Sequence, residues 1–291
     1  MADPPDPRPT TGHELTVATA KVNGIRLHYE LQGDRGIPLV LVHGSWDSRD
    51  DWGEVVSPLA ESYRVLAYDR RGHSRSQRTP GQGSIREDVA DLAALIEHLG
   101  LAPAWVAGNS FGASISIRLA CEHPGLLRGL IAHEPPLFSL LADDVVVAPM
   151  LEDVNRLIGA VVERIASGDH AGAAEQFVET VALGSGTWIH IPPEIQKSMI
   201  ENAPTFLDEA NDPEALAFDT TWLKGFSKPT LLTMGDQSPP TFAPVVRQLS
   251  AALPHAEVVT IRGAGHVPHS THPDTYVDLL RRFITGHDSG G

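Results

Sequence analysis

The chain carries two different patterns of hydrophobic residues. Near its start, residues 13–22 and 25–33 alternate apolar and polar side chains, and Asn23-Gly24 between them is a strong hairpin signal. From Pro38 onward, short runs that are apolar at nearly every position alternate with helical patterns. Because strands that are apolar on both faces belong to a parallel sheet covered by helices, the pattern predicts an α/β fold preceded by an antiparallel pair.

The apolar runs predict six further strands, at residues 38–44, 64–70, 102–110, 127–136, 229–235 and 256–263. A helix between the second and third of these runs can be checked by its spacing. Apolar residues recur there every three or four positions, at Val89, Leu92, Leu95, Ile96 and Leu99. This spacing predicts one buried helix face, with Gly100 just beyond the helix end.

The strand pattern stops between residues 137 and 223, where an apolar stripe from Leu151 to Ile165 has helical spacing. We expect this segment to be an inserted helical cap. The predicted core is then residues 15–136 and 224–286. The proline- and acid-rich residues 1–14 and the terminal residues 287–291 are expected to be disordered tails.

Composition narrows the functional classes. The 291 residues include 22 basic and 37 acidic side chains, a net charge of −15, which argues against a nucleic-acid or anionic-membrane partner. No apolar run approaches the roughly 18 residues of a membrane span, and the start lacks a signal-peptide pattern, so we expect a cytoplasmic protein. The single cysteine, Cys121, provides no metal-ligand spacing, and we expect it to be a buried structural thiol.

The sequence Gly108-Asn109-Ser110-Phe111-Gly112 stands where a predicted strand runs into a predicted helix. A serine at such a turn occupies a strained backbone conformation that lifts its hydroxyl clear of the sheet. The helix that follows points its N-terminus at the site, which favours developing negative charge. Ser110 is therefore the candidate nucleophile.

Three further motifs stand after predicted strands in the same order along the chain: Leu41–Trp46, Asp69–Ser76 and Gly263–His266. With the Ser110 turn, they resemble the α/β-hydrolase superfamily over residues of about 20–285. The first is similar to the HG-X oxyanion loop of that superfamily, the second to its D-x-x-G-x-G-x-S turn and the third to its G-x-x-H histidine loop. The resemblance implies a mostly parallel eight-stranded sheet with helices on both faces and an inserted helical cap.

A serine hydroxyl needs an adjacent base to become an effective nucleophile. His266 follows a predicted strand in a glycine-bearing loop and comes last in the chain, as the Ser, acid, His order of the family requires. His269 is nearby but lacks the motif position. His43 is expected to be a structural hydrogen-bonding residue rather than a second base.

The acid that orients the histidine is the point where the chain departs from the commonest family pattern. After the seventh strand, the position that usually holds the aspartate is occupied by Ser238, and Asp236 lies only one residue beyond the glycine. Glu134, 24 residues past Ser110, ends the sixth strand. This position is similar to that of the acid in zearalenone lactonases and certain haloalkane dehalogenases. We favour Glu134, with Asp236 as the alternative.

The resemblance also implies an oxyanion hole made by the backbone N–H groups of Ser45 and Phe111. We expect Trp46, Trp188 and Trp222 to line the substrate pocket, with core packing as the alternative for each.

Three arginines, Arg70, Arg71 and Arg75, follow the fourth predicted strand. They could suggest an anion site, but we expect a solvated turn that contacts helix ends.

The resulting hypothesis is a cofactor-independent, metal-free serine hydrolase that cleaves a small-molecule ester or lactone. A serine nucleophile removes dehalogenation, which needs a carboxylate at this turn, and disfavours epoxide hydrolysis. Carbon–carbon bond hydrolysis, cofactor-free oxygenation and a receptor role without turnover remain open. The oligomeric state also remains open.

Overall fold

The computed structural model describes residues 15–253 and 255–288. Eight strands form one sheet in the order β1-β2-β4-β3-β5-β6-β7-β8. Their bounds are β1 Leu15–Val22, β2 Ile25–Gln32, β3 Ile37–Val42, β4 Tyr63–Tyr68, β5 Ala104–Asn109, β6 Leu127–His133, β7 Thr230–Gly235 and β8 Ala256–Ile261.

The sheet is antiparallel at one edge and parallel elsewhere. β2 pairs antiparallel with both β1 and β4, and the remaining pairs are parallel. The hairpin turn has positive φ at both Asn23 (46°) and Gly24 (80°), conformations that these two residue types tolerate best. The predicted α/β-hydrolase fold, with its mostly parallel eight-stranded sheet, is confirmed.

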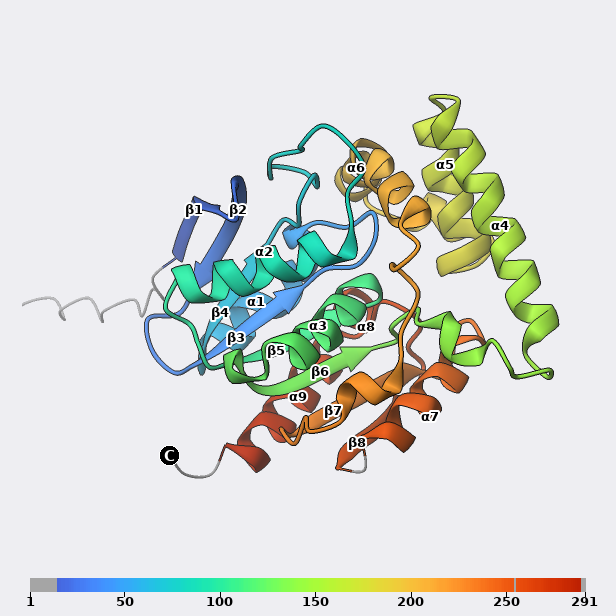
Figure 1. Ribbon diagram of the computed structural model, residues 1–291. Helices are drawn as coiled ribbons and strands as arrows, with labels where there is room; N and C mark the ends of the chain where they lie inside the picture. Colours follow the sequence, from blue (N-terminus) through green and yellow to red (C-terminus); the bar gives the residue numbers. More distant parts are fainter. Residues whose placement is uncertain (1–14, 254, 289–291) are drawn as a thin grey trace, which may run out of the picture.

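Helices cover both faces of the sheet (Figure 1). The longer ones are α1 Gly53–Ala60, α2 Ile85–His98, α3 Phe111–Glu122, α4 Ala148–Ala166, α5 His170–Phe177, α6 Pro193–Asn211, α7 Phe242–Ala252 and α9 Pro273–His287. The short helical segments are η1 Arg49–Trp52, η2 Pro124–Leu126, η3 Phe138–Leu141, η4 Val178–Ala182, η5 Trp188–His190, η6 Thr220–Leu223 and α8 Pro268–Thr271.

Two hydrophobic cores lie on opposite faces of the sheet. In β3, Leu39 and Leu41 pack in the core shared with α1 and α9. Val40 and Val42 alternate with them and pack in the core shared with α2, α3 and α7. Because successive side chains of a strand point to opposite faces, a run of apolar residues can fill both cores at once.

In the described chain, all elements between β6 and β7 are helical. Helices α4, α5 and α6 gather beyond one end of the sheet (Figure 1) and share a third core, which includes Val161, Ala174 and Phe206. This helical layer lies over the carboxyl end of β5, where the Ser110 turn begins.

Helix α2 illustrates how local signals set an element's ends. The Ser84 hydroxyl accepts a hydrogen bond from the Glu87 N–H at the start of the helix, and Gly100 follows its end with a φ of 62°. At the end of the chain, α9 extends to His287, whereas the predicted tail residues 1–14 and 289–291 lie outside the described residues. Within the described ranges, no helix combines the length and hydrophobicity needed to span a membrane.

Candidate active site

Ser110 stands between the last residue of β5, Asn109, and the first residue of α3, Phe111. Its φ of 54° and ψ of −123° lie in a region that residues other than glycine rarely adopt. The Ser110 N–H donates a hydrogen bond to the carbonyl oxygen of His133 at 2.9 Å, which ties the turn to the neighbouring strand β6. The predicted strand-to-helix turn is therefore present, with its backbone strain located at the serine.

The two glycines of the pentapeptide allow the backbone to pass close to its neighbours. A Cβ at Gly108 would lie 2.3 Å from the carbonyl oxygen of Gly112. A Cβ at Gly112 would lie 2.2 Å from the carbonyl oxygen of Val42. Both distances are shorter than any ordinary contact, so β5 can pack on the start of α3, and α3 on the end of β3, only without side chains at these positions.

His266 lies in the loop between β8 and α8, and three contacts orient it. Its Nδ1 is 2.6 Å from Oε2 of Glu134. Its ring stacks on the ring of Phe242, with centroids 4.5 Å apart and planes 16° apart. Its carbonyl oxygen accepts a hydrogen bond from Nδ2 of Asn109 at 2.9 Å. The residue next to the candidate nucleophile thus anchors the histidine loop.

Glu134 follows the last residue of β6 and is completely buried. Its φ of 46° is a second strained position, beside that of Ser110 in the adjacent strand. One carboxylate oxygen is engaged by His266, and the other accepts the N–H of Gly235 at 2.7 Å. The carboxylate is thus held from two sides.

Opposing effects act on the pKa of Glu134. Burial by itself raises it, whereas the hydrogen bond with His266 and the nearby His133 and Ser238 side chains lower it. The net pKa lies below the ordinary value for glutamate. A carboxylate that stays ionised in a buried site can hold the imidazole by its Nδ1–H and stabilise the imidazolium form.

Asp236, the alternative acid, forms its hydrogen bonds with residues other than His266. Its Oδ1 accepts hydrogen bonds from the Gly263 N–H at 2.8 Å and from Gln237 Nε2 at 3.1 Å, and its side chain is exposed. It therefore stabilises the turn before the histidine loop. The arrangement brings together His266 and Glu134 and leaves Asp236 at the surface.

His133 is a buried neighbour that lies beside Glu134. Its Nδ1 is 2.9 Å from the Thr233 hydroxyl, and its Nε2 is 3.6 Å from Oε2 of Glu134. Burial lowers the pKa of His133 to about 4, so the ring is neutral at neutral pH. His133, Glu134 and His266 each place one potential metal-ligand atom within 4.8 Å of the others, a proximity that the His266–Glu134 hydrogen bond accounts for.

The loop after β3 contains Ser45, the second predicted oxyanion residue, and is supported by His43. Nε2 of His43 accepts the backbone N–H of Arg70 at 2.9 Å, so its proton resides on Nδ1, which donates to the Gly44 carbonyl oxygen at 2.9 Å. Burial and the adjacent Arg70 charge lower the pKa of His43 well below its usual value. His43 therefore serves this loop as a neutral hydrogen-bonding residue, as expected from the sequence.

The expectation of a solvated turn is wrong for Arg70. Its side chain is 1% exposed and pairs with Asp88 at 3.1 Å and with Glu209 at 2.9 Å. Its Nη1 also donates to the Gly44 carbonyl oxygen at 2.9 Å. Glu209 could not be predicted from the sequence, because a lone glutamate in a helix such as α6 gives no signal that it is buried. Arg75, from the same turn, remains exposed.

Two cavities of unequal size meet at Ser110 and His266, which line both of them. The smaller, which we call the apolar chamber, has mainly aromatic and aliphatic walls that include Phe111, Phe138, Val154, Ile158, Phe206 and Phe242. The larger, which we call the acidic chamber, opens toward η1 and the start of α6. Among its described lining residues it has no lysine or arginine, and its carboxyl groups are Asp47, Asp50, Asp51, Glu54 and Glu194.

The three tryptophans predicted for the pocket line neither chamber, which corrects the sequence-based assignment. Trp46 is fully buried behind the wall, with its ring 5.0 Å from those of Phe177 and Phe206, which do face the apolar chamber. Trp188 packs at the edge of the third core, and Trp222 is 48% exposed. Their positions depend on how the helices between β6 and β7 pack, which sequence spacing does not specify.

His269 and Cys121, which were not predicted to be catalytic, are both at least partly buried. His269, in α8, lines the acidic chamber and lies against Trp52, with ring centroids 4.2 Å apart and planes tilted by 32°. Burial lowers its pKa to about 3. Cys121 is partly buried in α3, and burial raises the pKa of its thiol to about 12. A thiol with this pKa is not a nucleophile at neutral pH.

Comparisons with known proteins identify the family and the fold. Residues 39–279 match the sequence profile of the alpha/beta hydrolase family. An uncharacterized hydrolase, YraK of Bacillus subtilis, is 38% identical over 125 residues, which are 42% of this chain and 46% of that protein. The match therefore spans less than half of the relative's length.

Solved structures show the same fold. A thermophilic esterase from Thermogutta terrifontis has a TM-score of 0.75 at 23% identity, covering 94% of this chain and 99% of that one. An enol-lactonase from Burkholderia xenovorans LB400 has a TM-score of 0.75 at 21% identity, covering 92% and 100%. At these identities the similarity establishes the architecture alone.

Proposed function

The chain belongs to the alpha/beta hydrolase family, and from this premise we propose that it is a serine hydrolase that cleaves a carboxylic ester or lactone through an acyl-serine intermediate. The observation that carries the proposal is the 2.6 Å contact between His266 and the buried Glu134, in a site whose cavities also contain the strained Ser110. The fold neighbours include an esterase and an enol-lactonase, which supports this substrate class.

Acylation begins when the Ser110 hydroxyl attacks the substrate carbonyl carbon. His266 takes the hydroxyl proton as the new C–O bond forms, and Glu134 stabilises the resulting imidazolium. The tetrahedral intermediate then collapses, the bond to the leaving alkoxy group breaks, and His266 returns the proton to the departing alcohol. The acyl group is left on Ser110.

The oxyanion of the tetrahedral intermediate is stabilised by the N–H groups of Phe111 and Ser45. Phe111 is the first residue of α3, and the first N–H groups of a helix have no partner within the helix. Backbone donors held in place before the reaction favour the charge that develops in the transition state.

Deacylation reverses the same proton transfers with water as the nucleophile. His266 removes a proton from the water as its oxygen attacks the acyl carbon, and the proton then passes to Ser110 as the acyl bond breaks. The products are a carboxylic acid and the free enzyme. For a lactone, the alcohol and the acid remain in one molecule.

The two chambers divide the substrate. We assign the acyl group to the apolar chamber, because burying apolar surface there is favourable. The alcohol part enters the acidic chamber, which is larger and has more polar walls. The substrate class is therefore an ester or lactone of an apolar acid with a neutral or cationic alcohol part. The position of Glu134 after β6, similar to that of the acid in zearalenone lactonases, supports the inclusion of lactones.

The test combines turnover with covalent labelling. The wild-type chain should hydrolyse p-nitrophenyl butyrate and form a single adduct with a fluorophosphonate. Ser110→Ala should lose the adduct and at least about a thousandfold in kcat. Ser114→Ala, one turn further along α3, is the matched control and should keep both. Absence of turnover on esters, lactones and vinylogous diketones, together with absence of an adduct, would instead support a receptor.

A further inference from the structure

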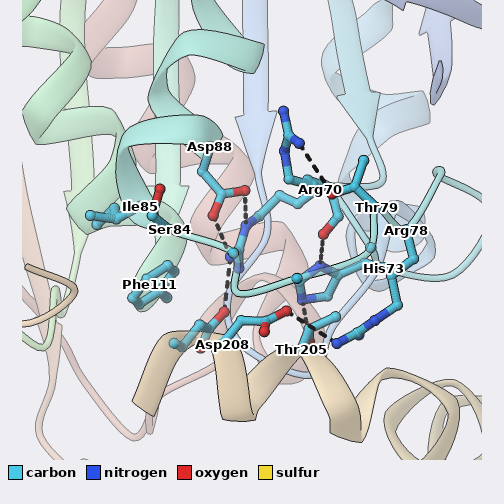
Figure 2. Close-up of a pocket in the computed structure, with 15 residues that line it drawn as sticks. Arg70, His73, Arg78, Thr79, Ser84, Ile85, Asp88, Phe111, Thr205 and Asp208 are labelled. Atoms are coloured by element: carbon cyan, nitrogen blue, oxygen red, sulfur yellow. Dashed lines mark hydrogen bonds and ion pairs between the residues drawn. The ribbon is translucent and has the colours of Figure 1, made fainter. Parts of the chain in front are cut away.

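Arg70 has a buried guanidinium between the oxyanion loop and the cap. Figure 2 shows it extended from the turn after β4, with Asp88 of α2 on one side and helix α6 of the cap nearby. Its Nη2 lies 3.1 Å from Asp88 and 2.9 Å from Glu209 of α6. The guanidinium of Arg70 thus connects the turn after β4 and helix α2 with helix α6.

The same guanidinium acts on the peptide that carries an expected oxyanion donor. The carbonyl oxygen of Gly44 and the N–H of Ser45 belong to one peptide group, and in a trans peptide they point in opposite directions. Arg70 Nη1 and His43 Nδ1 both donate to this carbonyl oxygen at 2.9 Å. These two donors restrict rotation of the peptide plane, and the positive charge polarises it so that its N–H becomes a stronger donor.

Glu209 reaches this loop directly from the cap. Its Oε2 accepts the Ser45 hydroxyl at 2.5 Å, while its Oε1 pairs with Arg70 at 2.9 Å. One carboxylate from α6 therefore contacts both the side chain of Ser45 and the guanidinium that supports the Ser45 peptide. Arg70 also lies 4.8 Å from the ring centroid of Phe111, the residue with the other expected oxyanion N–H.

We propose that Arg70 and Glu209 are positioning residues, which orient the Ser45 N–H for oxyanion binding when helix α6 of the cap is seated on the core. The inference rests on the proposed serine hydrolase function. It links catalysis to the cap, because the loop loses one of its supports when α6 moves away. Glu209 also lines the apolar chamber, but neither residue touches the substrate carbonyl in this scheme. Both act through the Gly44–Ser45 peptide.

A simpler explanation is that Glu209 only attaches the cap. The chain provides a matched control, because the adjacent residue Asp208 joins the same helix to the same turn through Arg78 at 3.1 Å. The Asp208–Arg78 pair is partly exposed, and Arg78 donates to Asp208 and to the Pro204 carbonyl oxygen, both in α6 and neither in the loop of Ser45. If cap attachment alone matters, loss of either pair should have a similar effect.

The experiment compares Glu209→Gln with Asp208→Asn in the full-length chain. The readouts are kcat and KM for p-nitrophenyl butyrate and the inhibition constant of a trifluoromethyl ketone with the same acyl group, which mimics the oxyanion. We expect Glu209→Gln to lower kcat about tenfold with little change in KM. The inhibition constant of the ketone should rise by a similar factor. Asp208→Asn should change each value by less than about twofold.

Ser45→Ala provides a second variant if Glu209→Gln fails to fold, because it removes only the hydroxyl contact with Glu209 and keeps the backbone N–H. It should lower kcat and weaken the ketone in parallel. Unchanged kcat and ketone affinity in Glu209→Gln or Ser45→Ala, or equal losses in Asp208→Asn, would overturn the proposal. The fluorophosphonate adduct at Ser110 reports on the hydrolase function separately, since it should form in all these variants.

Discussion

Nδ1 of His266 lies 2.6 Å from Oε2 of Glu134, although 132 residues separate them in the chain. The contact forms because Glu134 follows β6 and His266 follows β8, and these two strands run parallel with β7 between them. The carboxyl ends of parallel strands meet at one edge of a sheet, where α/β proteins commonly place their sites.

This relationship predicts different effects for the two candidate acids. Glu134→Gln keeps the shape of the side chain but removes the charge that stabilises the imidazolium, so kcat for an ester substrate should fall by about 10³ to 10⁴. Asp236→Asn alters an exposed turn residue and should stay within about threefold of wild type. Steady-state kinetics of the two variants at one pH makes the comparison. A larger loss of kcat in Asp236→Asn than in Glu134→Gln would show that Asp236, and not Glu134, is the acid.

The stacking of Phe242 on His266 predicts a role in holding the imidazole. Phe242→Leu keeps an apolar side chain in the chamber wall but removes the ring, and an aromatic pair contributes about 0.5–1.5 kcal/mol beyond its buried area. We expect kcat to fall roughly three- to tenfold. Phe206→Leu, on the same chamber wall but packed against Trp46 and Phe177, is the control. Equal losses of kcat in both variants would show a general effect on the pocket.

The close approach of Gly112 to β3 predicts a severe folding defect in Gly112→Ala. The added Cβ would lie 2.2 Å from the Val42 carbonyl oxygen, and backbone on both sides limits relaxation. We expect a loss of at least about 3 kcal/mol in the free energy of unfolding, measured with urea. Gly125→Ala is the control, because no atom lies within 4 Å of its added Cβ. A Gly112→Ala variant as stable as this control would contradict the packing described here.

The charge of the acidic chamber predicts that the enzyme discriminates between substrates by the charge of their alcohol part. Among esters of one apolar acid, a cationic or neutral alcohol should give a higher kcat/KM than an anionic alcohol of similar size. The difference should be about tenfold at low salt and shrink as salt screens the exposed carboxylates. Glu54→Gln combined with Glu194→Gln should reduce it. A salt-independent preference would point to shape instead of charge.

Asp51, in the wall of the same chamber, predicts a pH-dependent stability. Burial is the main cause that raises its pKa from 3.8 to about 6, so the folded state favours the protonated carboxyl. The associated stability is fully present below pH 3.8 and is lost as the pH rises through about 6.

Asp51→Asn mimics the protonated form and keeps an oxygen to accept the Ser48 N–H. Between pH 4 and pH 7 its stability should therefore rise relative to wild type by up to about 3 kcal/mol, at 1.36 kcal/mol for each pKa unit. Urea unfolding at a series of pH values measures the change, with Asp50→Asn as the exposed control. A constant difference across this range would rule out titration of Asp51.

Much of the fold followed from local patterns. Runs of apolar residues, the Asn23-Gly24 turn and the helical spacing of α2 predicted the strands and their order of appearance, because strand and helix periods are properties of neighbouring residues. Ser110 could be placed at its turn for the same reason. Its flanking glycines and the change from strand to helix are all visible within a short segment.

Other parts of the site depended on contacts between distant segments. Trp46 and Arg70 both follow strands in recognisable loops, yet both contact α6, which lies more than a hundred positions away in the chain. No spacing in the sequence indicates that Glu209 is buried against Arg70 or that Phe242 stacks on His266.

The sequence by itself determined the type and order of the elements and placed Ser110, Glu134 and His266 at the ends of strands. Only the tertiary structure decided which carboxylate meets His266, which side chains form the chamber walls and how the cap reaches the Ser45 loop. The physical reason is the range of the interactions. Backbone propensity and hydrophobic period act between neighbours in the chain, whereas burial, ion pairing and ring stacking act between any groups that the fold brings together.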